Sequence, residues 1–304
     1  MLEVKDLVVT AGGVRIVDGV SFEVRPGEVL GMVGESGSGK TMTMLAVAGL
    51  LSGPARVAGG TAVLDGTELT EARLERLRGR RIGFVFQDPA TSLNPLMRVG
   101  TQISEVLRIH GVSRGEARRR AAELLEQVGL GPERAGRYPH ELSGGQRQRI
   151  VIAMAIALGP SLLIADEPTT ALDVTVQEQV MQVLRTAQRE TGAATVLVSH
   201  DLGLVAEAAH RIAVMYAGRL VETGTVEEVL GAPRHPYSAA LMRSRPRVGT
   251  GRGPLPVIPG YPPAPKSRPP GCAFHPRCPV ALDRCAKETP PLVGGVACWA
   301  VQDG

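Results

Sequence analysis

The stretch that decides the fold is Leu142-Ser143-Gly144-Gly145-Gln146, because it stands between two motifs that handle nucleotides. Upstream, residues 34–41 read GESGSGKT, and downstream, residues 162–167 read LLIADE. Residues 147–155 carry strong helix formers and apolar residues at helical spacing, so Ser143 is the expected N-cap of a helix. A helix that begins with two glycines can donate several backbone N–H groups to a phosphate.

The upstream motif has the form of a phosphate-binding loop. It follows the short apolar run 29–33, so strand, glycine-rich turn and helix come in the order that such a loop requires. Backbone N–H groups and the helix N-terminus would face the phosphates, Lys40 would reach the β- and γ-phosphates, and the Thr41 hydroxyl would ligate Mg²⁺. The expected ATP-binding residues of the loop are Gly34, Glu35, Ser36, Gly37, Ser38, Gly39, Lys40 and Thr41.

Two carboxylates end the downstream motif. Residues 162–165 are apolar without a break, as in a strand buried on both faces of a parallel sheet, and Asp166 and Glu167 follow them. Open α/β sheets bind their ligands at the carboxyl ends of the strands. Asp166 would hold Mg²⁺ through its water shell, and Glu167 would polarise the water that attacks the γ-phosphate.

The order and spacing of these motifs resemble those of ATP-binding cassette (ABC) ATPases. The resemblance implies that His200, after residues 195–199, is similar to the switch histidine that contacts the γ-phosphate. It implies that Gln87, after residues 82–86, senses and ligates Mg²⁺, and that Asp173 lies in a loop that crosses between two subunits. It further implies that a second phosphate cradle serves the ATP bound to a partner subunit, and this cradle is formed by Ser143, Gly144, Gly145 and Gln146.

The family resemblance also implies the fold. We expect an α/β P-loop ATPase with a RecA-like core of parallel strands, an N-terminal antiparallel β subdomain, and a helical subdomain at about 89–158 that bears the signature. Strands are expected near 2–10, 14–24, 29–33, 61–65, 82–86, 161–166, 195–199 and 211–216, and helices across about 99–158 and near 175–191 and 202–209. Ala11 stands where the family usually has an aromatic that stacks on adenine, so Val14, Ile16 or another group would cover the ring.

Composition changes near residue 231. Residues 1–230 have a net charge of −3, whereas residues 231–304 have a net charge of +7 and hold 15 of the 23 prolines and all four cysteines. We therefore expect an ABC ATPase domain at 1–230 and a small Cys- and Pro-rich extension at 231–304. The acidic balance of the first part argues against nucleic acid as a partner.

The sequence predicts a protein that stays in the cytoplasm. The longest nearly uncharged run, residues 150–165, is interrupted by Gly159-Pro160-Ser161 and falls short of the roughly 20 residues that cross a bilayer. The N-terminal residues MLEVKDLVVT lack the basic-then-apolar layout of an export signal.

The four cysteines, in a protein expected in the cytoplasm, argue for a metal or cluster site rather than disulfides. Four thiolates suit zinc or an iron–sulfur cluster, and the spacing lacks the CxxC pairs of zinc ribbons. Some similar importer ATPases are credited with a [4Fe–4S] cluster, so the resemblance favours a cluster over zinc, and four free thiols are the remaining alternative. The expected ligands are Cys272, Cys278, Cys285 and Cys298.

Residues 86–95, FQDPATSLNP, resemble a segment of the ATPase subunits of dipeptide and oligopeptide importers, including their nickel-uptake relatives. The tail is similar to the C-terminal extension of the same subfamily in four motifs, namely HPYSAAL at 235–241, IPG at 258–260, GCAFHPRCP at 271–279 and CW at 298–299. The resemblance implies an ATP-hydrolysing subunit that energises peptide import from the cytoplasmic face of the membrane.

The same resemblance implies the partners. They are a homologous ATPase subunit, in a heterodimer or a homodimer, two transmembrane permease subunits, and an extracytoplasmic solute-binding protein. Nickel or another solute is the alternative cargo. A more distant alternative is a cassette ATPase that acts on nucleic acid or ribosomes, but those relatives usually fuse two cassettes or carry a long coiled-coil insertion, and this sequence has neither.

Overall fold

The computed structural model describes residues 1–244 and 257–303, and the chain forms two compact units. The first unit consists of Met1–Leu2, Glu23–Val29 and Val63–Val198. The second unit consists of Glu3–Phe22, Leu30–Ala62 and Ser199–Gly304.

The first unit contains three parallel strands in the order β6-β7-β8. Ile82 of β6 (Ile82–Val85) pairs with Leu162 of β7 (Leu162–Asp166), and the same Leu162 pairs with Ala194 of β8 (Ala194–Val198). Every residue of β7 and β8 is buried, which explains why neither strand alternates apolar with polar residues. Gly83 of β6 has no room for a side chain because the carbonyl oxygen of Ala155 lies there.

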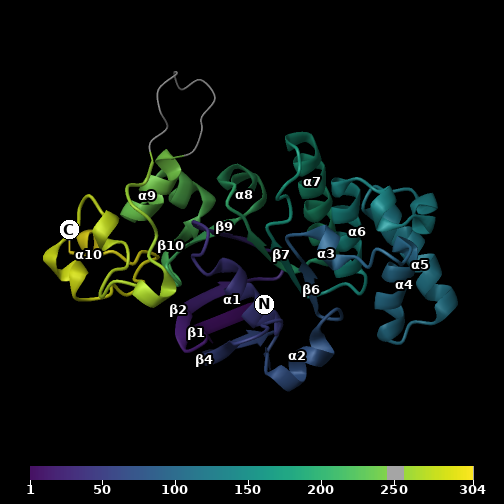
Figure 1. Ribbon diagram of the computed structural model, residues 1–304, viewed down its shortest axis with the longest axis horizontal. Helices are drawn as coiled ribbons and strands as arrows, with labels where there is room; N and C mark the ends of the chain where they lie inside the picture. The colour runs from purple at the N-terminus through teal and green to yellow at the C-terminus, as the bar shows by residue number, and fades with distance from the viewer. Residues whose placement is uncertain (245–256, 304) are drawn as a thin grey trace. The chain divides into compact units, whose positions relative to one another are not determined.

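The helices of the first unit gather around α6 (Gly144–Ile156). In Figure 1, α4 (Val99–Ile109) and α5 (Arg114–Gln127) lie side by side next to α6. Ile103 and Leu107 of α4 are fully buried, four residues apart and therefore on one helical face. The other elements of this unit are β5 (Thr67–Glu68), α2 (Glu71–Leu77), α3 (Pro89–Ser92), η1 (Pro132–Gly136), η2 (Pro139–Glu141) and α7 (Val174–Thr191).

The second unit contains two groups of strands. In one, β1 (Leu2–Ala11) lies between β2 (Val14–Val24) and β4 (Ala55–Leu64). In the other, β9 (Arg211–Tyr216) pairs in parallel with β3 (Val29–Val33) and antiparallel with β10 (Arg219–Thr225). The remaining elements are α1 (Lys40–Ala48), α8 (Leu202–Ala208), η3 (Glu227–Gly231), α9 (Pro236–Arg243), η4 (Pro265–Ser267), η5 (His275–Arg277), η6 (Asp283–Ala286) and α10 (Trp299–Gln302).

Several elements differ from the sequence-based expectation, among them β5, α2 and α10, which were not expected. Strand β4 begins at Ala55 rather than near residue 61, and within it Gly60, with φ +81°, lies against the backbone of Lys5 and Asp6 where a side chain would collide. Strand β10 was not expected, and it follows a tight turn in which Ala217 and Gly218 both have positive φ. Helix α9 was also not expected, and its N-cap is the buried His235.

The segment after residue 231 is held to the strands of the second unit. The backbone N–H of Ala297 donates to the carbonyl of Val221 at 2.8 Å, and the N–H of Thr223 donates to the carbonyl of Gly295 at 2.8 Å. Val296 also forms a β-bridge with Glu222. These bonds join residues far apart in the sequence, so the tail is part of this unit's packing.

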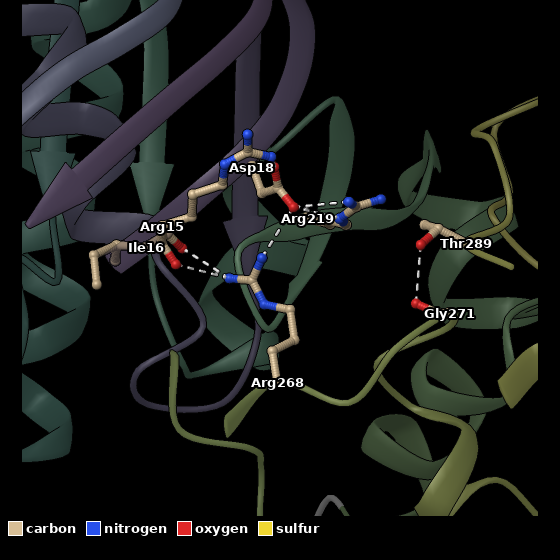
Figure 2. Close-up of polar contacts among 7 residues, drawn as sticks. All are labelled: Arg15, Ile16, Asp18, Arg219, Arg268, Gly271 and Thr289. Carbon is tan, nitrogen blue, oxygen red and sulfur yellow. Dashed lines mark hydrogen bonds and ion pairs between the residues drawn. The ribbon is translucent and has the colours of Figure 1, made fainter. Parts of the chain in front are cut away.

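Arg268 makes a second connection between the tail and β2, as Figure 2 shows. Its guanidinium donates to Asp18 Oδ2 at 3.1 Å and to the carbonyls of Arg15 and Ile16 at 3.2 and 3.5 Å. Arg219 donates to the same carboxylate oxygen at 2.7 Å. Burial by itself raises the pKa of Asp18, but the two guanidinium groups outweigh this effect and hold the pKa below its ordinary value.

His235 is a buried histidine at the N-cap of α9. Its exposed fraction is 1%. Its ring Nδ1 accepts the backbone N–H of Tyr237 at 3.0 Å, and its backbone N–H donates to Glu222 Oε2 at 3.0 Å. Burial lowers the pKa of His235 to about 4. The folded chain therefore keeps this ring neutral at a pH where the unfolded chain protonates it.

This difference predicts a loss of stability in acid. Between pH 6.5 and 4 the unfolded chain binds a proton that the folded chain does not, so His235 lowers the free energy of unfolding by about 2 kcal/mol at pH 5. The variant His235→Asn keeps a side-chain acceptor at the N-cap but does not titrate. Urea unfolding at pH 7 and pH 5 should show a smaller acid loss in this variant than in the original chain. Equal losses in the two chains would contradict the prediction.

Candidate active site

The phosphate-binding loop connects β3 to α1 in the second unit. All five residues of β3 and Gly34 after them are buried, and the chain becomes exposed at Ser36. Gly34 has φ +152°, and a side chain there would collide with the carbonyl oxygen of Met215. Gly39 is the N-cap of α1 with φ +105°, in a conformation that residues other than glycine rarely adopt. Two of the expected glycines are therefore required by the backbone.

The polar groups of this loop fit a bound phosphate. Lys40 is buried, and its Nζ donates to the carbonyl oxygens of Gly34 at 2.8 Å and Glu35 at 3.1 Å. The Oγ of Ser38 is buried and has no hydrogen-bond partner among the residues that the structure describes. A buried hydroxyl without a partner and a cation at the start of a helix are groups that a phosphate would satisfy.

The acidic residues lie in the first unit, at the end of β7. Asp166 is buried, and Glu167 follows it with φ +46°, in the left-handed region that non-glycine residues adopt rarely and often at functional sites. Glu167 Oε2 accepts hydrogen bonds from Gln87 Nε2 at 3.1 Å and from Thr170 Oγ1 at 3.0 Å. The structure thus brings Gln87 and Glu167 together across 80 residues of sequence.

Thr170 begins the segment 170–173 that resembles the loop between subunits, but the sequence analysis assigned it no role at Glu167. It lies three residues after Glu167 and can hold the carboxylate in one orientation. A hydroxyl residue at this short interval is a weak signal, because the bond depends on the positive φ of Glu167, which the sequence does not reveal.

The expected Mg²⁺ ligands are all oxygen donors, as this ion prefers. They are the hydroxyl of Thr41, exposed in the first turn of α1, the amide of exposed Gln87, and the carboxylate of buried Asp166. Mg²⁺ usually takes one or two carboxylates together with substrate phosphates and water, and each of these side chains is of a type that it binds. Thr41 belongs to the second unit, and Gln87 and Asp166 belong to the first.

His200 and Asp173 lie at the ends of other elements. His200 is exposed, follows β8, and belongs to the second unit with the phosphate loop. Asp173 is the N-cap of α7, where its carboxylate accepts the N–H of Val176 at 3.0 Å. This cap gives Asp173 a local structural role in addition to the expected one between subunits.

The signature residues begin α6 as predicted. Ser143 Oγ accepts the N–H of Gln146 at 3.3 Å, and Gln146 Oε1 accepts the N–H of Ser143 at 3.1 Å, which together form a capping box. A side chain at Gly145 would collide with Val176 of α7, so close packing of α6 on α7 by itself requires this glycine. The two glycines are therefore weaker evidence for a phosphate cradle than the sequence analysis took them to be.

A polar hollow lies beside the signature. It has a volume of about 240 Å³, and Ser143, Gly145 and Gln146 line it together with Arg134 and Arg149. The two guanidinium groups lie near the N-terminus of a helix, but Glu133 lines the same hollow and pairs with Arg134 at 3.5 Å, so the positive charge there is partly neutralised.

The four cysteines do not support the metal centre expected from their pattern. Cys272, Cys278, Cys285 and Cys298 are free, and no three His, Cys, Asp or Glu side chains within residues 1–244 and 257–303 are arranged to hold a metal ion. Burial raises the pKa of the Cys272 thiol to about 11 and also raises the pKa of Cys278 and Cys298, and the neighbouring cysteines add to the shift of each. The predicted [4Fe–4S] cluster and its zinc alternative are thus unsupported by the structure.

Comparison with known proteins identifies the family. A family model described as "ABC transporter" matches residues 17–170, and one described as "Oligopeptide/dipeptide transporter, C-terminal region" matches residues 221–285. The chain belongs to the ABC transporter family. The ABC model spans the phosphate loop, the signature and the two carboxylates, so the family assignment rests on the residues described above.

Relatives of this ABC chain match it over most of its length. The dipeptide transport ATP-binding protein DppD of Escherichia coli (strain K12) is 50% identical over 285 residues, covering 91% of this chain and 87% of that protein. The oligopeptide transport ATP-binding protein OppD of Mycobacterium tuberculosis (strain H37Rv) is 50% identical over 305 residues, covering 96% of this chain and 50% of that longer protein.

Solved structures agree with the family. The dimeric structure of a post-hydrolysis state of the ATP-binding cassette MJ0796, bound to ADP and Pi, matches with a TM-score of 0.66 and 30% identity, covering 74% of this chain and 99% of that chain. CbiO1 from Clostridium perfringens, part of the ABC transporter complex cbiONQ, matches with a TM-score of 0.68 and 28% identity, covering 76% and 90%. The predicted fold class and ATPase activity are confirmed, and this ABC ATPase uses Mg²⁺ with ATP.

Replacement of the carboxylate that Gln87 and Thr170 hold should stop hydrolysis. Glu167→Gln keeps the shape of the side chain but loses its basic oxygen, so we expect ATP turnover to fall about 10²- to 10⁴-fold while Mg-ATP still binds. Steady-state phosphate release and nucleotide titration would measure the two effects. Glu178→Gln is a matched control, because Glu178 is an exposed carboxylate paired with Arg185. Near-normal turnover in Glu167→Gln would remove Glu167 from catalysis.

Proposed function

We propose that this chain is the ATP-hydrolysing subunit of a membrane importer of dipeptides or oligopeptides. The observation that carries the proposal is the match of residues 221–285 to the C-terminal region of oligopeptide and dipeptide transporters, in a chain whose body is an ABC ATPase. DppD and OppD, which are named for dipeptide and oligopeptide transport, support it at 50% identity. We divide the chain accordingly into an ATPase domain at 1–230 and a C-terminal extension at 231–304.

The proposed roles of the residues follow their chemistry. Gly34 to Thr41 bind the phosphates of ATP, with Lys40 neutralising their charge, while Thr41, Gln87 and Asp166 supply oxygen ligands to Mg²⁺. Glu167 polarises the attacking water, and His200 contacts the γ-phosphate. Magnesium neutralises the charge that develops on the phosphates during transfer.

The proposed partner of this subunit is a second ABC ATPase. Ser143, Gly144, Gly145 and Gln146 would bind the ATP of that partner, and the polar hollow beside them is lined by Arg149 and by the ion pair of Arg134 with Glu133. Asp173 would lie between the subunits. A heterodimer is expected with a homologous subunit, and a homodimer when the chain is alone.

We place the assembled protein on the cytoplasmic face of the membrane, bound to two permease subunits that receive solute from an extracytoplasmic binding protein. No helix within the described part of the chain has the length and apolar character needed to cross a membrane. Attachment through permease subunits fits that finding. Nucleic acid is not among the proposed partners.

The dimer prediction can be tested on purified chain. Glu167→Gln should accumulate a dimer at saturating Mg-ATP, because bound ATP joins the two cassettes and is not consumed. Size-exclusion chromatography with light scattering should show monomer without nucleotide and dimer with Mg-ATP, and Lys40→Ala in the same background should stay monomeric. A monomer at saturating ATP would argue against homodimerisation.

The cargo can be tested in the complete transporter. Proteoliposomes that hold the permease subunits and this ATPase should take up radiolabelled dipeptide when ATP is enclosed, and Glu167→Gln should reduce uptake to background while Glu178→Gln does not. Uptake of nickel in place of dipeptide would reassign the cargo. Failure to associate with any permease, with stimulation of the ATPase by DNA or ribosomes, would refute the transport role.

A further inference from the structure

Glu35, the second residue of the phosphate loop, is held by an arginine from the C-terminal segment. Arg277 Nη1 donates to Glu35 Oε2 at 2.8 Å, and Nη2 donates to Oε1 at 3.1 Å, so the pair is bonded at two points. The side chain of Arg277 is 6% exposed and that of Glu35 is 24% exposed. A two-point arginine–carboxylate pair fixes both groups in direction as well as distance.

A tyrosine from the same segment holds the backbone of Glu35. The hydroxyl of Tyr237, which is fully buried, accepts the N–H of Glu35 at 2.8 Å. The carbonyl of Glu35 in turn accepts a hydrogen bond from Lys40 Nζ at 3.1 Å. The C-terminal segment therefore binds a residue that itself contacts the lysine expected to bind phosphate.

Aromatic packing holds the side chains of Tyr237 and Arg277 in place beside the loop. Tyr216, Tyr237 and Phe274 form an aromatic cluster with ring centroids 4.6 to 5.4 Å apart. Arg277 lies over the rings of Tyr216 and Phe274 and donates to the carbonyl of Pro259 at 2.8 Å. An arginine supported on several sides presents its guanidinium in one position.

Charge gives this contact a consequence for nucleotide binding. Glu35 carries a negative charge inside a loop that must accept the negative phosphates of ATP, and Arg277 neutralises that charge. Without Arg277, an unpaired carboxylate would remain in the loop and repel the phosphates. The loop would also lose the contact that directs the Glu35 side chain.

We propose that Arg277 and Tyr237 of the C-terminal segment are positioning residues for ATP binding, which hold Glu35 in place and neutralise its charge. This inference rests on the proposed role of the phosphate loop. It assigns to the region matched by the oligopeptide/dipeptide transporter model a direct effect on the nucleotide affinity of the ATPase.

The test measures the dissociation constant of Mg-ATP by calorimetry on the full chain. Arg277→Ala should weaken binding about tenfold, within the range of 5- to 150-fold that coupling between two sites usually gives. The double variant Glu35→Gln with Arg277→Ala should recover most of the affinity, because it leaves no unpaired carboxylate. The loss in Arg277→Ala should also shrink at high salt, because salt screens the repulsion between charges that remain accessible to solvent.

Arg284→Ala is the matched control. Arg284 lies in the same segment, pairs with Glu288 at 2.9 Å and lies over the ring of Trp299, and these contacts lie away from the loop. We expect this variant to bind Mg-ATP as the original chain does. Tyr237→Phe, which removes only the hydroxyl, should weaken binding by a smaller factor than Arg277→Ala.

Several results would overturn the inference. Unchanged affinity for Mg-ATP in folded Arg277→Ala would do so. A loss of affinity that Glu35→Gln does not rescue, together with a lower unfolding temperature, would also do so, because that loss would reflect general loosening of the tail. If Arg277→Ala does not fold, Arg277→Gln, which removes the charge but keeps a polar side chain, and Tyr237→Phe decide, and original affinity in both would refute the proposal. Lys40→Ala tests the role of the phosphate loop separately from the role of Arg277 and Tyr237, because normal Mg-ATP binding in that variant would refute the proposed role of the loop itself.

Discussion

Burial of parallel strands on both faces is the constraint on which the functional residues depend. A strand such as β7, in which every residue is buried, has no surface for a polar side chain along its length. Polar chemistry must then begin where the strand ends, and Asp166 and Glu167 stand at that point. The same reasoning applies to β3, which is buried throughout and continues directly into the phosphate loop at Gly34.

The segment after residue 231 takes part in the structure of the second unit through polar pairs and aromatic packing. Arg268 and Arg219 share the carboxylate of Asp18, and Arg277 pairs with Glu35. Arg268 and Arg277 of the tail thus each meet an acidic residue that precedes α1. Part of the positive charge of the tail is therefore paired inside the protein. The same segment is the region that marks the subfamily, so its matching motifs include residues that support the phosphate loop.

The signature shows how one residue can satisfy two requirements. Gly145 allows α6 to approach Val176 of α7, and it also lines a hollow with two arginines beside the helix N-terminus. Packing therefore requires the glycine whether or not a phosphate binds. Ser143 and Gln146 cap the helix at the same place, and this keeps the backbone N–H groups at the start of α6 in a defined direction.

The sequence by itself determined the features that depend on near neighbours. The glycines of the phosphate loop, the unbroken apolar strands, and the capped start of α6 each follow from a few adjacent residues, and their order along the chain was sufficient to indicate the family. It did not determine β10 or α9, because a turn through Ala217 and a buried histidine cap have no clear local signal. The cysteine spacing suggested a metal centre that the structure does not support.

Only the tertiary structure decided which distant residues meet. Glu167 bonds to Gln87 across 80 positions, Glu35 to Arg277 across 242, and Asp18 to Arg268 across 250. Spacing in the sequence carries no information about such pairs, because their geometry depends on how strands and loops pack in three dimensions. The chemistry of the phosphate loop was therefore readable from the chain, whereas the contacts that hold the loop in place required the fold.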